Sequence, residues 1–237
     1  MKNVFFGLVL AMFSVSAMAA DVDVNVGASS DYLYRGETVT AGEPAVFAGF
    51  KANNVVFDNL SFSVDAVVLN TSPVNENKTL RTEVGVGYGL NFGSVAVDAG
   101  AYRVFNPVLY AEDYNELRTQ ATWQATDKLS VFGRAAHIVS DSVQNDSYVA
   151  VGTKYDGLFV DNLSVSLLAS TFRDDATADF SFNNVELTAE YQVLKGLYAF
   201  GTYSVGGATV KDAFDEELTF RARDIPSVGM VGIRYQF

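Results

Sequence analysis

The sequence predicts an all-β protein: a transmembrane antiparallel up-and-down β-barrel of about 12 strands, preceded by a cleaved signal peptide. Three observations favour this fold. Most of the chain alternates apolar and polar residues, which places the two kinds on opposite faces of a strand. An export signal stands at the N-terminus, and short connections alternate with longer polar ones. A closed barrel in the outer membrane, with one face in lipid and the other turned inward, accounts for all three.

Residues 1–19 have the composition of a secretory signal peptide. Lys2 stands near the start, an apolar run covers residues 4–15, and Ala17-Met-Ala19 provides a small-residue cleavage motif. An uncleaved inner-membrane anchor is the alternative, but a membrane-spanning helix needs about 20 apolar residues. We therefore expect cleavage before Ala20. Residues 20–237 would then form one barrel domain in the outer membrane of a Gram-negative bacterium.

The clearest strand opens the mature chain. Val22, Val24 and Val26 begin an apolar face that continues to Tyr34, while polar residues from Asp23 onward share the other face. A half-buried strand of a soluble protein also alternates, but this length suits a tilted crossing of about 10 residues. The same pattern predicts eleven further strands, at residues 45–53, 60–70, 80–90, 95–105, 115–125, 129–140, 147–156, 163–172, 185–193, 197–205 and 227–237.

The connections between these strands fall into two classes. Five are short, at residues 54–59, 91–94, 126–128, 157–162 and 194–196. The interleaved ones are mostly longer and rich in Asp, Glu, Asn and Pro, at residues 36–44, 71–79, 106–114, 141–146, 173–184 and 206–226. Outer-membrane barrels have short periplasmic turns and longer extracellular loops, so both termini are expected on the periplasmic side. Residues 218–223 alternate within the last loop, which leaves ten or fourteen strands as alternatives.

The chain ends on an alternating apolar segment with a terminal aromatic residue, formed by Val231, Ile233, Tyr235 and Phe237. This ending resembles the C-terminal signal read by the bacterial outer-membrane insertion machinery, which is therefore an expected partner during biogenesis. Aromatic residues near strand ends are expected to form the two girdles at the membrane interfaces. They are Tyr32, Tyr34, Tyr88, Phe105, Trp123, Phe172, Tyr235 and Phe237.

The composition excludes several classes of function. The chain has 28 acidic and 16 basic residues and a formal charge of −12, which argues against nucleic acid as a partner because phosphate binding needs a basic face. Cysteine is absent, so disulfides and thiolate metal sites are excluded. Loop carboxylates, such as Glu112 with Asp113, lack the spacing of a dedicated metal loop. We expect no cofactor and no resident metal.

An enzymatic function is also not expected. The only histidine is His137, and Ser140 follows three residues later. Outer-membrane phospholipases carry His and Ser two positions apart on one strand, whereas a separation of three sends the side chains to opposite faces of a regular strand. A place in a girdle, or a packing role, therefore suits His137 better than catalysis.

Charged residues on the inward face decide what a barrel of this size does, because eight strands leave an interior that side chains fill and sixteen leave a channel. The residues predicted to line the lumen are Arg81, Glu83, Glu116, Arg118, Arg134, Glu186, Glu190 and Arg234. Inward glycines such as Gly85, Gly152 and Gly232 are expected to leave room. The alternative is a plugged barrel in which the same Arg and Glu residues form salt bridges.

Ser30-Asp-Tyr-Leu-Tyr-Arg-Gly36 and the following Pro44-Ala-Val-Phe-Ala-Gly49 resemble the N-terminal signature of the TorF family of proteobacterial porins. That signature is approximately Ser-Asp-Tyr-x-Phe-Arg-Gly, followed by a short loop, a Pro and a strand of small residues. Tyr34 stands where Phe is usual. The resemblance implies an outer-membrane barrel with channel activity. Independently of it, Asp31 and Arg35 are expected inward or at the rim, where a pair of them could hold the first loop in place.

Together these observations predict a porin-like channel for passive diffusion of small hydrophilic solutes or ions. Acidic residues outnumber basic ones on the predicted inner face, which favours cations weakly. The alternative is a non-conducting barrel that acts through its extracellular loops as an adhesin, receptor or structural envelope protein. Outer-membrane lipid and lipopolysaccharide are expected partners in either case.

Overall fold

A computed structural model describes residues 21–35, 37–38, 40, 42–55, 58–70, 78–105, 113–139, 146–174, 180–210 and 227–237. The predicted signal peptide (residues 1–19) and most of the predicted long loops, including 206–226 beyond residue 210, lie outside these residues. Within the described residues, no helix is long and apolar enough to cross a membrane.

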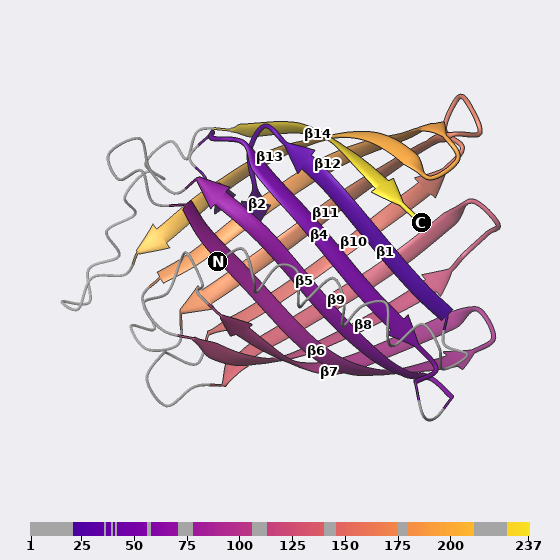
Figure 1. Cartoon of the computed structure of the whole chain (residues 1–237), viewed down its shortest axis with the longest axis horizontal. Helices are drawn as coiled ribbons and strands as arrows, with labels where there is room; N and C mark the ends of the chain where they lie inside the picture. The colour runs from indigo at the N-terminus through magenta and orange to yellow at the C-terminus, as the bar shows by residue number, and fades with distance from the viewer. Residues whose placement is uncertain are drawn as a thin grey trace.

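Twelve strands of the described chain close into an antiparallel barrel, which confirms the predicted fold class and strand number (Figure 1). Each strand pairs with the next along the chain, and the last closes on the first through pairs such as Ala28 with Ile233. The barrel strands are β1 (Asp21–Ser29), β4 (Ala45–Asn53), β5 (Leu60–Asn70), β6 (Lys78–Phe92), β7 (Val95–Phe105), β8 (Tyr114–Gln124), β9 (Leu129–Val139), β10 (Ser147–Asp156), β11 (Leu163–Asp174), β12 (Phe180–Leu194), β13 (Leu197–Val210) and β14 (Val228–Gln236).

The alternation along each strand separates a lipid-facing wall from an inward face, as the sequence predicts. On β8, Leu117 and Trp123 are more than half exposed on the outside, whereas Glu116 is fully buried inside. On β14, Val231 and Ile233 are similarly exposed on the outside. Lipid replaces water around these exposed apolar residues.

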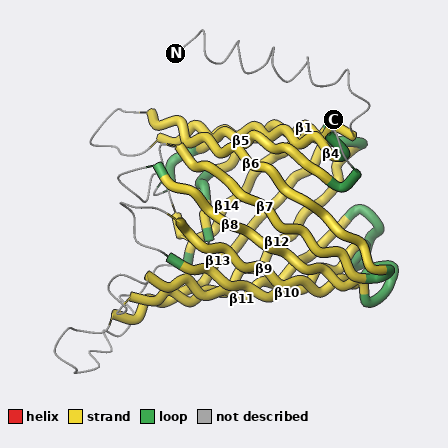
Figure 2. The backbone as a smooth tube through the Cα atoms, turned by 90° about the horizontal axis from the view of Figure 1, so that it is seen from below, coloured by secondary structure: helices red, strands yellow, loops and turns green. Residues whose placement is uncertain are grey.

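Both described ends of the chain lie at the same end of the barrel, where the described turns are short (Figure 2). Gly93 and Gly196 adopt positive φ angles of 65° and 81° in two of these turns, a conformation that glycine reaches without strain. We assign this end to the periplasm because the tight turns of such barrels lie there. The opposite end is extracellular.

The first strand is shorter than the sequence predicts. The alternation suggests a strand up to Arg35, but β1 ends at Ser29 and the chain turns into the barrel. The Asp31 carboxylate accepts hydrogen bonds from the Tyr32 amide at 2.7 Å and from the hydroxyls of Thr38 and Thr40. Asp and Ser favour such turns because their side chains satisfy nearby backbone groups. This local bonding overrides the alternating pattern.

After this turn, β2 (Leu33–Tyr34) pairs with β3 (Glu37–Thr38), and Arg35 adopts a positive φ of 55° between them. We call the described residues 31–35, 37–38 and 40 the inner hairpin. Two predictions are wrong here. The partners of Asp31 are Thr38 and Thr40 rather than Arg35, and the aromatic rings of the hairpin pack inside the barrel rather than in an interfacial girdle. Phe172 also packs inward, against a cluster that contains Tyr148.

Candidate functional site

The inner hairpin is attached to the barrel wall through Arg35. Its guanidinium forms an ion pair with Glu116 of β8 and lies 4.9 Å from the ring centres of both Tyr34 and Tyr148. Arginine pairs with carboxylates and stacks on aromatic faces through the same planar group. One side chain therefore connects the hairpin with two strands of the wall.

Glu116 belongs to a network of buried charges beneath the hairpin. Arg118 donates to Glu116 at 2.5 Å and to Glu83 at 2.7 Å, and Arg81 donates to Glu83 at 3.0 Å. Arg81, Glu83 and Glu116 are 6%, 5% and 0% exposed. Buried charges are tolerated when each is paired and hydrogen-bonded. The alternation of acid and base through this network meets that condition.

Tyrosine rings cover the same network. Arg81 lies 4.7 Å from the ring centre of Tyr34, and Arg118 lies 4.2 Å from that of Tyr102. Burial raises the pKa of the Tyr34 phenol, so the hydroxyl stays protonated. It lies 3.5 Å from the hydroxyl of Tyr114. The hairpin therefore rests on a layer that is charged but fully paired.

Apolar side chains fill further inward positions near the extracellular end, an arrangement that the sequence does not predict. Val104, Tyr114 and Ile138 form one buried cluster. A second cluster contains Ala45 and Val67, against which the hairpin tyrosines and Phe47 pack. The alternating pattern assigns these residues to the inner face, but it does not reveal that the inner face is dry at this level. The hairpin tyrosines supply the apolar surface that covers Ala45 and Val67.

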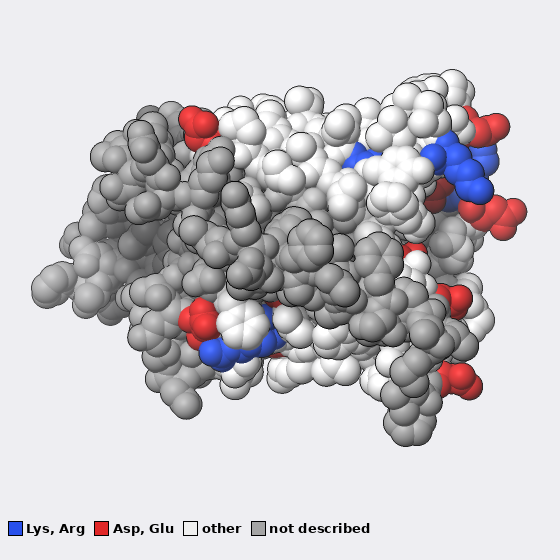
Figure 3. All heavy atoms as spheres, in the orientation of Figure 1, with Lys and Arg blue, Asp and Glu red and all other residues white. Residues whose placement is uncertain are grey.

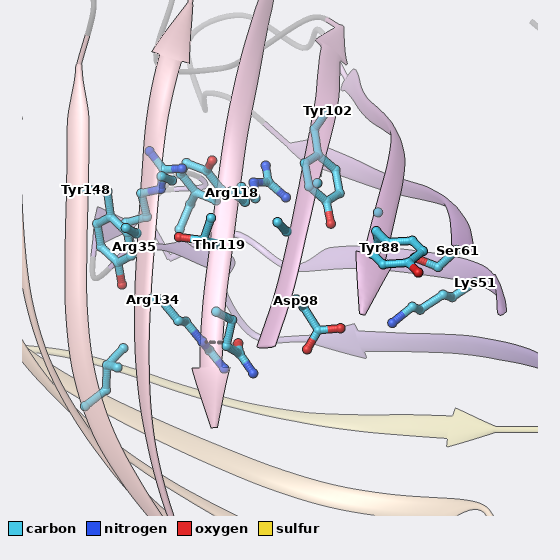
Figure 4. A pocket seen from close by; sticks show the side chains of 18 of the residues that line it. Arg35, Lys51, Ser61, Tyr88, Asp98, Tyr102, Arg118, Thr119, Arg134 and Tyr148 are labelled. Carbon is cyan, nitrogen blue, oxygen red and sulfur yellow. Dashed lines mark hydrogen bonds between the residues drawn. The ribbon is translucent and has the colours of Figure 1, made fainter. Parts of the chain in front are cut away.

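A cavity of about 420 Å³ lies inside the barrel beside the hairpin. Figure 4 shows Arg35 and Arg118 at one end of this cavity, with Arg134, Asp98 and Lys51 around the rest of it. Glu186 also lines it. Besides Arg35 and Arg118, which belong to the paired network, two bases and two acids line the cavity.

No two of these four charged groups lie within ion-pair distance of each other. Arg134 donates to the Gln120 amide oxygen at 2.8 Å, and Glu186 accepts from the Asn184 amide at 3.1 Å. Within the described part of the chain, none of Lys51, Asp98, Arg134 and Glu186 forms an ion pair. Charged groups without a counterion can bind a charged or dipolar solute.

All eight residues predicted to line the lumen lie on inward positions, but they fall into three groups. Arg81, Glu83 and Glu116 are buried beneath the hairpin and support it instead of facing open space. The next group lines the cavity and consists of Arg118, Arg134 and Glu186. The last group is Glu190 with Arg234, which form an ion pair at 2.7 Å and are about 30% exposed. The salt bridges of the plugged alternative are thus present beneath the hairpin and again between Glu190 and Arg234, near the periplasmic turn that contains Gly196.

Lys51 lines the cavity although it is absent from the predicted set. It lies on β4, where Ala45-Val-Phe-Ala-Gly49 alternates poorly and does not indicate which face is which. The pairing of β4 with β1 and β5 decides the faces, because it places Lys51 opposite Asp23 and Ser63. The sequence therefore indicates the inward position of Lys51 only through the alternation of the neighbouring strands.

Four inward glycines lie beneath aromatic rings rather than beside empty space, which corrects the prediction that Gly85, Gly152 and Gly232 leave room. Tyr102, Phe132 and Phe200 lie against glycines directly opposite them on the neighbouring strand. The four pairs are Gly27 with Phe47, Gly85 with Tyr102, Gly152 with Phe132 and Gly232 with Phe200. A ring that lies flat on the wall occupies less of the lumen than one that projects across it.

Gly152→Ala is expected to lower the free energy of unfolding by about 1–3 kcal/mol, the usual cost of overpacking. A Cβ atom at this position would lie 2.7 Å from the Leu167 carbonyl oxygen and closer still to the Phe132 ring. Gly133→Ala is the matched control on the next strand, since its Cβ would meet nothing nearer than 3.9 Å. Urea unfolding in detergent micelles measures both, and equal stability of the two variants would contradict the ring-over-glycine interpretation.

His137 lies on the lipid-facing side of β9, near the extracellular end. Its Nδ1 atom is 3.1 Å from the hydroxyl of Ser147 on β10. Ser140 lies outside the described residues. This position is consistent with the predicted place of His137 at an interface.

No known family model matches the chain, and no curated protein matches it in sequence. Among solved structures it is similar to the KdgM porin, with a TM-score of 0.61, 12% identity, and coverage of 91% of this chain and 99% of that one. A KdgM porin in complex with disordered oligogalacturonate matches with a TM-score of 0.60, 11% identity, and coverage of 91% and 98%. The NanC porin matches with a TM-score of 0.57, 13% identity, and coverage of 92% and 99%.

The chain has the fold of a porin-type outer-membrane barrel. Identities this low establish a shared fold and not a shared substrate. The similarity does not single out the TorF family, whose signature stays a resemblance over residues 30–49.

Proposed function

We propose that this protein is an outer-membrane channel for passive diffusion of small hydrophilic solutes or ions, with the inner hairpin as its constriction. The observation that supports this most is the cavity beside the hairpin, lined by Lys51, Arg134, Asp98 and Glu186 without mutual ion pairs. Maintaining four such charges in a dry interior would be costly, so water or solute must reach them. The porin-type fold agrees with this proposal.

The cavity favours solutes that carry both signs of charge or strong dipoles, because its lining residues outside the paired network include two bases, Lys51 and Arg134, and two acids, Asp98 and Glu186. Elsewhere on the inner face, Asp65 adds a carboxylate that forms no ion pair among the described residues. We therefore propose weak cation selectivity. Planar-bilayer recording of the purified protein tests the channel directly: the absence of discrete conductance steps over a range of salt concentrations would remove this function.

Glu186→Gln is expected to lower the permeability ratio of cations to anions by about twofold, equivalent to about 0.4 kcal/mol, because it removes one unpaired negative charge from the lumen. The reversal potential in a salt gradient measures this ratio. The control is the double variant Glu190→Gln/Arg234→Gln, which removes a paired acid and base together and leaves the net charge unchanged. An unchanged reversal potential in Glu186→Gln would contradict a water-filled lumen at this level.

One observation favours the second candidate, a barrel that conducts nothing and acts through its loops. The hairpin, the paired network and the apolar clusters fill much of the inward face near the extracellular end. The TorF resemblance favours the channel instead, since its Ser-Asp-Tyr-x-Phe-Arg-Gly segment overlaps the inner hairpin. Measurement of the conductance with and without the Arg35–Glu116 ion pair, which attaches the hairpin to the wall, separates the two candidates.

A further inference from the structure

The charged groups that line the cavity outside the paired network alternate in sign around the barrel. In Figure 3 the visible outer wall between the two ends of the barrel is mostly uncharged, whereas these groups face the lumen. From β4 to β12 they are Lys51, Asp98, Arg134 and Glu186, so that each base is followed by an acid. A singly charged ion that approaches one of these groups is repelled by the next, whereas a solute with both charges is attracted at both ends.

Arg134 is held in place while part of its guanidinium stays available. Its Nε atom donates to the Gln120 amide oxygen at 2.8 Å, and its guanidinium lies 4.7 Å from the centre of the Phe132 ring. Gln120 is fixed in turn, because its amide donates to the Thr122 hydroxyl at 3.2 Å. An arginine has five N–H donors, so the terminal N–H groups of Arg134 remain for a further acceptor. A planar fork that is fixed in this way matches a carboxylate.

Asp98 supplies the opposite charge in the same row of the sheet. Gln120 of β8 stands opposite Asp98 of β7 on one side and opposite Arg134 of β9 on the other. Asp98 and Arg134 are therefore two strands apart, about 10 Å between their Cα atoms. Among the described residues the Asp98 carboxylate forms no ion pair, and it is exposed to the lumen. Figure 4 shows both side chains projecting into the cavity.

Glycines keep space open beside Asp98. Gly87 and Gly100 stand directly opposite each other and line the cavity, and Gly89 stands opposite Asp98. The nearest side-chain atom to a Cβ at Gly87 would be the Ser61 hydroxyl, and at Gly89 it would be the Asp98 carboxylate. These two glycines thus differ from the four that lie beneath aromatic rings. Glycine inside a strand commonly marks a place where a ligand approaches the backbone closely.

We propose that this cavity binds zwitterionic solutes of the amino-acid and short-peptide class, with the carboxylate on Arg134 and the ammonium group on Asp98. The cavity volume of about 420 Å³ suits a small solute. The Glu186 charge also acts on Arg134 and weakens the binding of a simple anion there. This inference deepens the proposed function and rests on it, because a solute reaches the cavity only if the lumen is open to water at one end at least.

The test measures equilibrium binding of L-alanine to the purified mature barrel in detergent by saturation-transfer NMR. Two comparison solutes each lack one charge: lactate keeps the carboxylate, and ethylamine keeps the ammonium group. L-Alanine is expected to bind at least about tenfold more tightly than either, because charge-assisted hydrogen bonds form at both of its ends. Equal binding of the three solutes would overturn the inference.

The double variant Asp98→Asn/Arg134→Gln removes one acid and one base from the row and leaves the net charge unchanged. It is expected to bind L-alanine about tenfold more weakly than the wild type. Glu190→Gln/Arg234→Gln is the matched control, since it removes an acid and a base that do not line the cavity, and should bind as the wild type does. Arg134→Lys keeps the charge without the planar fork and should lose only part of the affinity.

Unchanged affinity in Asp98→Asn/Arg134→Gln, or an equal loss in its control, would contradict the assigned site. Resistance of the folded band to detergent at room temperature in electrophoresis checks that each variant forms a barrel. Bilayer recording of the same proteins separates this inference from the proposed channel. Conductance together with equal binding of the three solutes removes the solute class and leaves the channel. Preferential L-alanine binding by a barrel that does not conduct supports the site and removes the channel.

Discussion

Arg35→Ala is expected to raise the single-channel conductance of the barrel at least about twofold, because a wider constriction passes more ions. Within the described residues, the Arg35–Glu116 contact is the only ion pair between the inner hairpin and the wall. The same guanidinium lies against Tyr148 of β10. Without these contacts the hairpin can move away from the wall while its Asp31 turn remains intact.

Planar-bilayer recording at fixed salt measures this effect, with Lys128→Ala as a control that removes a charge from a periplasmic turn. If the wild type is silent and Arg35→Ala conducts, the hairpin is a plug, and the loop-borne function describes the resting barrel. Equal conductance in the wild type and in Arg35→Ala would show that the hairpin does not set the constriction.

Glu116→Gln is expected to lower the free energy of unfolding by about 3–5 kcal/mol, since removal of one partner from a buried charge network leaves the other uncompensated. Glu116 is fully buried and accepts hydrogen bonds from Arg35 and Arg118. Glutamine keeps the shape of the side chain but not its charge. Arg118 still has Glu83, so the loss falls mainly on Arg35. Urea unfolding in lipid vesicles, followed through the single tryptophan, Trp123, measures the change.

Glu190→Gln is the matched control for this stability measurement. It makes the same chemical change in an ion pair with Arg234 whose side chains are about 30% exposed. Solvent screens such pairs, which contribute about 0–1 kcal/mol. Equal destabilisation by Glu116→Gln and Glu190→Gln would mean that the network beneath the hairpin is no more important to the fold than a solvent-exposed pair.

The two expected results concern one structural unit. The charges that stabilise the extracellular part of the barrel also hold the inner hairpin, which narrows the lumen. Glu116 takes part in both roles, because it pairs with Arg118 in the network and with Arg35 of the hairpin. A substitution that loosens the hairpin through Arg35 leaves Glu116 paired with Arg118. A substitution at Glu116 affects both. Comparison of Arg35→Ala with Glu116→Gln therefore separates the conductance effect from the stability effect.

The long strands could be predicted because their pattern is local. Along β12, Val185, Leu187 and Tyr191 face lipid while Glu186 and Glu190 face inward, and this alternation depends only on strand geometry and on the two solvents that the faces meet. The inward placement of all eight predicted lining residues follows from the same rule. Strand ends differ from the prediction by a few residues, as for β13, which continues to Val210.

The class of fold, the faces of the strands and the set of charges that point inward follow from the sequence alone, because each depends on neighbours one or two residues away. Tertiary structure decided which charges meet. Arg35 reaches Glu116 across 81 positions of sequence and Arg118 reaches Glu83 across 35, pairings that exist only because the barrel closes and the hairpin turns inward. Such contacts depend on strand register and on competition between turn and strand at Asp31. The alternation of apolar and polar residues specifies neither of them.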